Sequence, residues 1–241
     1  MAGDILHFTT RIDQPELLDQ GYGTERDVRA NLAEMWRINR VLGGMRALTR
    51  HLYPRLAAAR GALTLIDLGA GSADAPIAIA AWAYARRLSI SIVPIDWSTR
   101  NLAVARMGVN GAQPISLLRA DALCLPFAHD SVDFVISTLL LHHFNPAQAI
   151  QLLRDTFAIA RRAIIISDLV RGALPYLAFK LAQPIFARNY LTRHDGALSV
   201  RRAYTPNELR ALAEAAGLPE ARVYTHVPWR MTLVVDKSSR P

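Results

Sequence analysis

The fold is decided by the stretch Leu63-Thr64-Leu65-Ile66-Asp67-Leu68-Gly69-Ala70-Gly71-Ser72-Ala73-Asp74. Its first half is an apolar run with β-branched residues, which predicts a buried parallel strand. Its second half is a short turn with two glycines. The residues from Pro76 to Arg87 then favour a helix, for which Asp74 is the expected N-cap. A strand, a glycine turn and a helix start together predict a cradle for a nucleotide-like ligand.

Two acidic residues of this stretch indicate which charge the ligand carries. Asp67 lies inside the apolar run, where a carboxylate is costly to bury unless something pairs with it. The third glycine of the dinucleotide fingerprint G-x-G-x-x-G is absent, because Asp74 stands there. An acidic side chain disfavours a pyrophosphate and favours a cationic or zwitterionic group. The alternative is a turn that needs its glycines for geometry alone.

The stretch from Asp67 to Asp74 resembles motif I of the class I S-adenosylmethionine (SAM)-dependent methyltransferases, acidic-x-Gly-x-Gly-x-x. The resemblance implies an α/β fold with a doubly wound, mostly parallel seven-stranded sheet, Rossmann-like, behind an N-terminal helical cap. It implies a lead-in over residues 1–60 and a methyltransferase domain over 61–241, with an acceptor-side insertion at about 172–204. SAM is the implied cofactor, and its amino-acid end would be held by Asp67, Gly69, Ala70, Gly71 and Asp74.

Further cofactor contacts are expected where later strands end. Asp96 follows the strand Ser89–Ile95 and can accept hydrogen bonds from ribose hydroxyls, although it could instead cap the helix from Thr99 to Met107. The aromatic ring of Trp97 is placed to flank an adenine. The resemblance adds four candidates around the cofactor: Asp121 and Ala122 at the adenine, Leu139 after the fourth strand, and Arg37 near the cofactor carboxylate.

Histidines supply the candidate catalytic groups. The Leu-His-His-Phe loop with His142 and His143 follows the fourth strand, and in the resembled family this loop sits beside the transferable methyl. His194 and Asp195 are adjacent and could form a general-base pair, since a carboxylate orients and charges an imidazole. Packing, helix capping and loop ordering remain the alternatives for these histidines.

An acceptor side is expected after the fifth strand. Gly172 to Tyr190 is apolar, aromatic and interrupted by prolines, which favours a helical insertion lining an apolar acceptor pocket, with core packing or a dimer contact as alternatives. A small group of bacterial class I methyltransferases is similar over most of the chain, through Arg37-Ile-Asn-Arg40, Asp168-Leu-Val-Arg171 and His194-Asp-Gly-x-x-Ser-Val-Arg-Arg202. The candidate acceptor contacts are Arg40, Leu141, Asp168, Arg171, Tyr176, Phe179 and Tyr204.

Composition bounds the remaining possibilities. Lysine and arginine exceed aspartate and glutamate by 28 to 20, a net charge of +8, but no dense basic block with interleaved aromatics indicates a nucleic-acid partner. Residues 137–140 read Ser-Thr-Leu-Leu and lack the Asn/Asp-Pro-Pro-Tyr/Phe signature of amino-methylating nucleic-acid enzymes. The single Cys124 excludes an internal disulfide and a cysteine-rich metal site, and we assign no metal ligands. No signal peptide or membrane span is visible, so we expect a cytoplasmic monomer or homodimer, with peripheral membrane contact left open.

Taken together, these patterns predict SAM-dependent methyl transfer to a small aromatic, phenolic or quinone-like acceptor, with O-methylation as the working hypothesis. One alternative is an NAD-dependent oxidoreductase, which would keep the cradle and Asp96 but leave Asp67, Asp121 and the absent third glycine unexplained. The other is a non-catalytic relative that only binds SAM. Fold alone does not identify the acceptor or the atom that is methylated.

Overall fold

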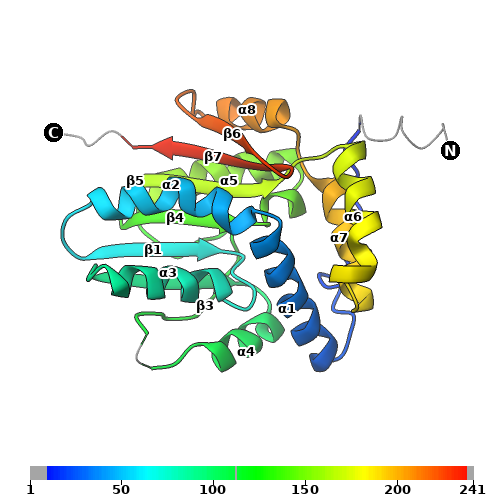
Figure 1. Cartoon of the computed structure of the whole chain (residues 1–241). Coiled ribbons are helices and arrows are strands. Elements are labelled where there is room, and N and C mark those ends of the chain that lie inside the picture. Colours follow the sequence, from blue (N-terminus) through cyan, green and yellow to red (C-terminus); the bar gives the residue numbers. More distant parts are fainter. Residues whose placement is uncertain (1–9, 112, 238–241) are drawn as a thin grey trace.

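A computed structural model of the chain describes residues 10–111 and 113–237. Its centre is a seven-stranded sheet with the order β3-β2-β1-β4-β5-β7-β6 (Figure 1). The strands are β1 (Leu63–Leu68), β2 (Ile90–Asp96), β3 (Leu118–Arg119), β4 (Val132–Thr138), β5 (Ala160–Leu169), β6 (Arg222–His226) and β7 (Arg230–Asp236). The helices are α1 (Glu25–Val41), α2 (Gly44–Ala58), α3 (Asp74–Ala85), α4 (Thr99–Gly108), α5 (Pro146–Ile159), α6 (Ala173–Phe186), α7 (Tyr190–Arg202) and α8 (Pro206–Ala215), with a 3₁₀ turn η2 (Leu141–His143).

The sheet is parallel from β3 to β5 and antiparallel at its closing hairpin. The central strand β1 pairs with β2 in the register Leu63↔Ile90 and with β4 in the register Leu65↔Phe134. The last strand, β7, lies antiparallel between β5 and β6. The expected mixed, mostly parallel sheet of seven strands is therefore confirmed, including its antiparallel final hairpin.

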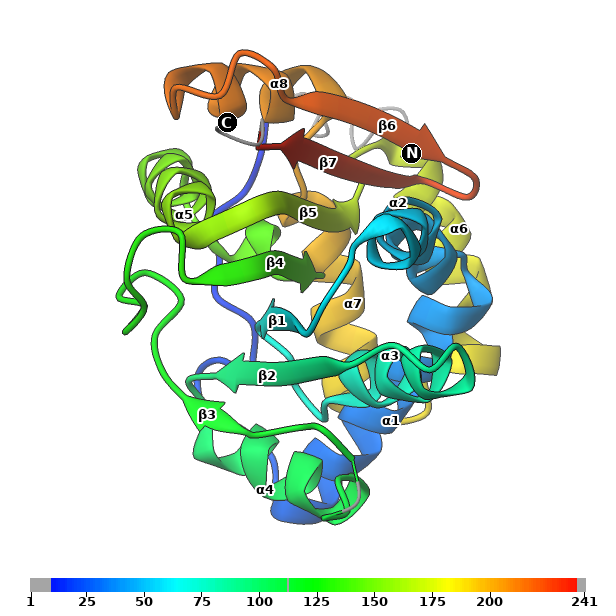
Figure 2. The same cartoon turned by 90° about the vertical axis from the view of Figure 1, so that its left-hand side faces the viewer.

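Helices cover both faces of the sheet, each over its own apolar core (Figure 2). On one face, α2 and α3 bury Leu48, Leu52 and Ile79 against the strands. On the other, α5 and α8 bury Leu152 and Leu209. Because the strands between these layers are buried on both sides, the run from Leu63 to Leu68 is almost entirely apolar, with Thr64 and Asp67 as the exceptions.

A third group of helices lies across the carboxyl ends of the parallel strands, where Figure 1 shows α1, α6 and α7 side by side. Helix α6 rests on α7 so closely that a Cβ at Gly196 would meet Cζ of Phe179 at 2.4 Å. Its outer side exposes a stripe of four residues: Leu174, Leu177, Leu181 and Ile185. Within the described residues, no helix is both long and apolar enough to cross a membrane.

Most element boundaries follow the sequence pattern. Gly43 lies between α1 and α2, which begins at Gly44, and Thr205 caps α8 in a reciprocal capping box with Glu208. The predicted N-cap Asp74 is wrong by one residue, because Ala73 in the left-handed region (φ +59°) is the cap and Asp74 is the first helical residue. The division of the chain at residue 60 stays a prediction, since α2 packs into the same core as β1.

Candidate active site

A cavity of about 700 Å³ opens where β1, β2 and β4 end. Its size falls in the range of small-molecule sites, about 300–1,000 Å³. One wall is the glycine turn after β1, another is α1, and a third is the turn η2 together with residues 16–19. In a doubly wound sheet this edge is the place where the loops after successive strands converge, which is why ligands bind there.

The glycine turn is fixed by close packing. Gly69 has φ +68°, and a Cβ built on it would meet Cδ1 of Leu140 at only 2.7 Å. Gly71 also has a positive φ, +55°. Ala70 completes the turn and lines the cavity with both glycines. The turn therefore needs glycine at residue 69 for two reasons, the backbone angle and the approach of Leu140.

Asp96 connects this turn to the end of β2. Its Oδ2 accepts a hydrogen bond of 2.8 Å from the Gly71 amide, and its Oδ1 accepts one of 2.9 Å from the Ser98 amide. Burial raises the pKa of the Asp96 carboxyl, while these hydrogen bonds oppose the rise. Asp96 thus faces the cavity and also holds its rim. Beside it, Trp97 is 60% exposed.

Asp67 is the most conspicuous polar group of the cavity. It is 2% exposed, and its Oδ1 has no hydrogen-bond partner within the part of the chain that the structure describes. Burial, and then the charge of Asp96, raise the pKa of Asp67 well above its ordinary value. A buried carboxyl oxygen without a partner costs free energy until a donor reaches it.

Asp67 Oδ1 is one of several buried polar atoms that have no hydrogen-bond partner in the described chain. Within residues 10–111 and 113–237, six buried side-chain polar atoms lack a partner, and four of them belong to residues that line this cavity. All four can accept hydrogen bonds: Asn39 Oδ1, Asp67 Oδ1, Asn101 Oδ1 and Thr138 Oγ1. A cavity lined by residues with unsatisfied hydrogen-bond acceptors fits a ligand that carries N–H and O–H donors.

Helix α1 presents one face to the cavity. That face carries Asn31, Leu32, Met35, Trp36 and Asn39, at helical spacing. The predicted cofactor contact Arg37 points elsewhere, because its guanidinium donates to the Phe186 carbonyl at 2.8 Å. Arg40 is also on an exposed side of the helix. Neither Arg37 nor Arg40 is therefore part of the cavity lining in the described chain.

Another wall of the cavity is a cluster of imidazoles and carboxylates. His142 Nδ1 lies 2.8 Å from Asp168 Oδ1, and His143 Nδ1 lies 2.7 Å from Asp19 Oδ2. The Nε2 atoms of both rings face Glu16, at 3.5 Å from Oε1 for His142 and 3.9 Å from Oε2 for His143. Glu16, His142 and His143 all line the cavity.

The imidazoles and carboxylates of this cluster shift one another's pKa. Burial disfavours the charged His142, but Asp168 and Glu16 outweigh it and raise its pKa to about 9. Burial likewise opposes ionisation of Glu16, yet the two histidines and Ser199 lower its pKa to about 2. At neutral pH, His142 therefore carries a proton and Glu16 is an anion, so in this arrangement His142 donates rather than accepts a proton.

The segment that supplies Glu16 and Asp19 has no regular secondary structure and is held by α7. Asp195 accepts hydrogen bonds from the Leu17 amide at 2.9 Å and the Leu18 amide at 3.1 Å. Ser199, one turn further along α7, donates to Glu16 Oε1 at 2.6 Å. Asp195 therefore anchors this segment, while its partner His194 lies on the outer side of α7.

Comparisons with known proteins agree with this geometry. Residues 66–156 match the family model described as "Methyltransferase domain". Residues 66–156 therefore form a methyltransferase domain, and the fold of the chain is that of solved SAM-dependent methyltransferases. The mostly parallel seven-stranded sheet with helices on both faces is the class I fold. No curated protein matches the chain in sequence.

Solved structures resemble the methyltransferase in fold. A protein described as a putative SAM-dependent methyltransferase, from Methanococcus maripaludis, is 13% identical with a TM-score of 0.59, covering 91% of this chain and 98% of its own. Magnesium protoporphyrin IX methyltransferase from Synechocystis PCC 6803, solved with S-adenosylhomocysteine (SAH), is 17% identical with a TM-score of 0.55, covering 81% and 84%. A putative O-methyltransferase from Nostoc punctiforme is 21% identical with a TM-score of 0.54, covering 83% and 59%.

The methyltransferase brings most predicted cofactor residues to one cavity. Those that line it are Asp67, Gly69, Ala70, Gly71, Asp74, Asp96, Trp97, Asp121, Ala122 and Leu139. Leu139 adopts φ +58°, an unusual angle for leucine, directly after β4. Of the predicted catalytic residues, His142, His143 and Asp195 line the same cavity, and His194 does not.

Several predicted acceptor residues instead have structural positions. Arg171 is buried and forms two hydrogen bonds to Glu208, and Tyr204 donates to the Phe144 carbonyl at 2.8 Å. Leu141 is buried in the core. Asp168 is buried behind His142. None of these four residues, nor Tyr176 and Phe179 of α6, is part of the cavity lining in the described chain, so their contact with an acceptor stays a prediction.

The sequence analysis missed the residues that close the cavity from outside the sheet. Glu16 and Asp19 come from a stretch without periodicity, so no pattern identified them. Asn31 and Asn39 carried a usable signal, since both interrupt the apolar stripe of a predicted helix and are eight residues apart. Two buried amides on one helix face, one turn on either side of Met35, indicate a polar ligand.

Proposed function

We propose that this methyltransferase transfers the methyl group of SAM to a hydroxyl oxygen of a small aromatic, phenolic or quinol-like molecule. The observation that carries the proposal is that one cavity is lined both by the glycine turn with Asp67 and Asp96 and by the cluster of Glu16, His142 and His143. A binding site for the cofactor and a polar wall for a second molecule therefore share one cavity.

Residues of the chain suit the two ends of the cofactor. The unpartnered Oδ1 of Asp67 suits the ammonium group of the amino-acid end, which the glycine turn leaves room to approach. Asp96 suits the ribose hydroxyls, and Asp121 with Ala122 and Trp97 suits the adenine. When bound, SAM supplies an electrophilic methyl on a sulfonium. The chain's own contribution is alignment, worth about 7–11 kcal/mol in favourable cases.

The other part of the cavity suits a hydroxylated ring. Leu18, Leu140 and Phe144 supply apolar surface, while Glu16 and Asp19 supply carboxylates that accept hydrogen bonds from hydroxyl groups. The reaction forms an oxygen–methyl bond as the sulfur–methyl bond breaks, giving a methyl ether, SAH and a proton. The fold likeness to a putative O-methyltransferase agrees with an oxygen acceptor.

The test measures methyl transfer from labelled SAM to separate panels of phenols and quinols, amines, carbon nucleophiles and RNA. We expect labelling of the phenol and quinol panel, and labelling confined to RNA or to amines would contradict the proposal. His143→Gln should remove activity while SAH binding persists, because His143 lies on the acceptor wall. The matched control is His129→Gln, at an exposed histidine outside the cavity lining.

The same reasoning extends to partners. We infer that the acceptor is a free small molecule in the cytoplasm and that neither nucleic acid nor a membrane span takes part, with the protein acting as a monomer or homodimer. SAH binding without methyl transfer on any of the panels would instead support the non-catalytic alternative, and binding of NADH in preference to SAH would support the oxidoreductase alternative.

A further inference from the structure

We propose that Glu16, His142 and His143 form a binding site for one divalent first-row transition-metal ion, facing the acceptor side of the cavity. One ligand atom from each residue lies within 4.8 Å of the other two. The set combines two imidazole nitrogens with one carboxylate oxygen. The sequence offered no metal ligands, because Glu16 is far from the histidines in the chain. The role suggested below for the ion depends on the proposed function, but the site itself does not.

The geometry needs little adjustment to hold an ion. Metal–nitrogen and metal–oxygen bonds of about 2.0–2.2 Å place neighbouring ligand atoms of a tetrahedral site about 3.4 Å apart. His142 Nε2 is already 3.5 Å from Glu16 Oε1, and His143 Nε2 is 3.9 Å from Glu16 Oε2. Bringing each pair to that spacing takes a contraction of about 0.1 Å for His142 and about 0.5 Å for His143, and the ligand atoms of the three residues lie within 4.8 Å of one another.

Each of the three ligands is oriented by a partner of its own. Asp168 binds His142 at Nδ1, and Asp19 binds His143 at Nδ1, so both Nε2 atoms are directed toward Glu16. Ser199 donates to Glu16 Oε1 at 2.6 Å. A carboxylate on the remote nitrogen of a ligating histidine is the usual outer arrangement of metal sites, because it fixes the ring and strengthens the ligand. Here both histidines have it.

The backbone of the histidine turn is also clamped. Arg11 donates to the carbonyls of His142 at 2.6 Å and Phe144 at 2.9 Å, and Arg202 donates to the carbonyl of His143 at 2.8 Å. Two guanidinium groups therefore fix the turn that carries both imidazoles. This rigidity is what a preformed site requires, since loosely held ligands bind an ion at the cost of their own ordering.

The donor set indicates which ions fit. Two imidazole nitrogens and one carboxylate suit zinc, cobalt, nickel or ferrous ions, whereas magnesium and calcium prefer oxygen ligands alone. Three protein ligands leave at least one position open, as in catalytic rather than structural sites. Since the cluster lines the cavity, the open position faces the space proposed for the acceptor, where a hydroxyl oxygen could occupy it.

The test uses the full-length chain without an affinity tag, stripped with a chelator and desalted. Cobalt is titrated in and followed by its visible absorption bands, and zinc by competition with a chromophoric chelator. We expect one ion per chain and visible bands typical of nitrogen and oxygen ligands. Glu16→Gln and His143→Gln should weaken binding by more than about 100-fold, and Asp19→Asn, which alters the outer partner of His143, by about 10–100-fold.

The matched control for Asp19→Asn is Asp13→Asn in the same segment. The Asp13 side chain is 66% exposed and contacts Arg11 at 3.8 Å rather than the histidines, so its replacement should leave metal affinity unchanged. Thermal unfolding and SAH binding are measured on every variant. The inference is overturned if the wild type binds no stoichiometric ion, or if variants that still fold and bind SAH keep the wild-type metal affinity.

This experiment separates the metal site from the proposed reaction. A chain that methylates phenols but binds no ion refutes the metal site and leaves the reaction in place. A chain that binds one ion through these residues but methylates no oxygen acceptor supports the metal site and refutes the proposed function.

Discussion

The backbone amide of Gly71 donates a hydrogen bond of 2.8 Å to Oδ2 of Asp96, joining the turn after β1 to the end of β2. Asn101 on α4 also contacts the same carboxylate, at 3.3 Å from Oδ1. The residue proposed to bind ribose hydroxyls is therefore also the residue that positions the glycine turn, and one carboxylate serves both purposes.

Replacing Asp96 should consequently affect both cofactor affinity and stability. We expect Asp96→Ala to weaken SAH binding at least about tenfold, because one lost charge-assisted hydrogen bond corresponds to about 1.5–3 kcal/mol. Isothermal titration calorimetry gives the dissociation constant. Asp96→Asn keeps an oxygen that can accept from Gly71, and should have the smaller effect. An unchanged dissociation constant in Asp96→Ala would remove this residue from the site.

Gly69 offers a test of the close approach of Leu140. Gly69→Ala introduces a Cβ 2.7 Å from Leu140 Cδ1 at a backbone angle of φ +68°. The matched control is Gly61→Ala, where φ is +84° and the Cβ has open space. Both substitutions should cost about 1–2 kcal/mol for the left-handed angle alone. Only Gly69→Ala should cost more than that in urea unfolding, and only it should impair SAH binding. Equal losses in the two variants would show that the contact with Leu140 is unimportant.

The sequence was most informative where one residue type has one physical use. Gly69, Gly71 and Asp96 could be predicted because a glycine turn after a strand and an acid after the next strand converge at one sheet edge. Arg171 and Tyr204 could not be placed from the sequence, because a polar residue near a strand end can equally serve packing, and only the fold reveals that Glu208 and the Phe144 carbonyl lie beside them.

Glu16 could not be placed for a different reason. It belongs to an irregular segment whose position depends on contacts with α7, about 180 residues further along the chain. Tertiary contacts of this kind leave no periodic trace in the sequence. The histidine pair was noticed for its loop, but the carboxylates that orient each ring, Asp168 and Asp19, were not recognised as its partners.

The pairing of Arg171 with Glu208 predicts a stability defect without a functional one. Arg171 is buried, and its guanidinium donates to both carboxylate oxygens of Glu208, at 2.9 Å and 2.6 Å. Glu208→Ala should lower the free energy of unfolding by about 2 kcal/mol, because it leaves a buried charge with fewer partners and removes half of the α8 capping box. Chemical denaturation measures the loss.

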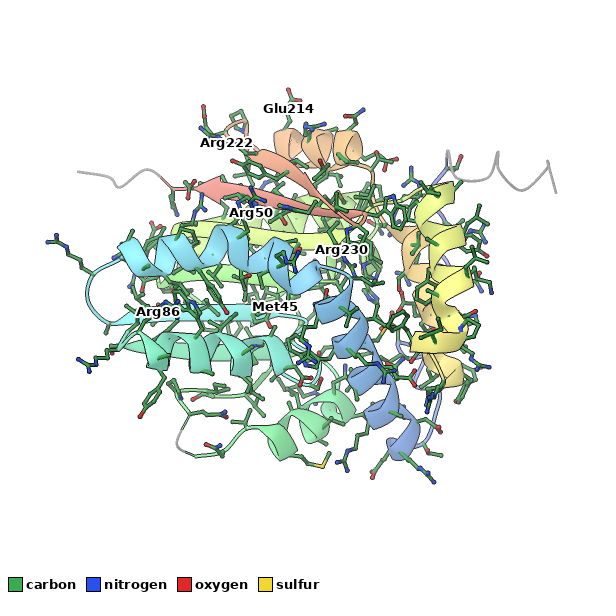
Figure 3. The ribbon with its side chains drawn as sticks, viewed as in Figure 1. Met45, Arg50, Arg86, Glu214, Arg222 and Arg230 are labelled. Carbon is green, nitrogen blue, oxygen red and sulfur yellow. The ribbon has the colours of Figure 1, made fainter. Side chains whose placement is uncertain are left out.

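The control for this prediction is Glu214→Ala on the same helix. Glu214 is exposed at the outer end of the molecule, near Arg222 of β6 (Figure 3). Its replacement should change stability by less than about 0.5 kcal/mol. SAH affinity should be unaltered in both variants, and a selective loss of affinity in Glu208→Ala would return Arg171 to the binding site.

A second histidine pair, away from the cavity, predicts acid sensitivity. His51 of α2 and His226 of β6 place their Nε2 atoms 3.4 Å apart. Burial, together with the charge of His226, lowers the pKa of His51 to about 4, and burial lowers that of His226. The unfolded chain, with ordinary histidine values near 6.5, takes up protons first. The contribution of this histidine pair to the free energy of unfolding is therefore fully present above about pH 6.5 and is lost as the pH falls toward 4.

The measurement is urea unfolding at several pH values between 7.5 and about 4.5. In the double variant His51→Gln/His226→Gln, the free energy of unfolding should fall by about 1 kcal/mol less over this pH range. This value is smaller than the full pKa shift implies, because the pair is partly exposed to solvent. His129→Gln, at an exposed position, should leave the slope unchanged. A double variant with the wild-type slope would place the acid sensitivity elsewhere.

The anchoring of Leu17 and Leu18 by Asp195 has a consequence for how the enzyme matures. During synthesis the glycine turn emerges long before α7, so the early chain can assemble a cofactor cradle that still lacks one side. That side is closed only when Asp195 of α7 binds the backbone amides of Leu17 and Leu18. Helix α7 is followed by α8, β6 and β7, so this side of the cavity forms before the sheet is complete, and a nascent chain that is released before α7 would leave any bound cofactor open to water.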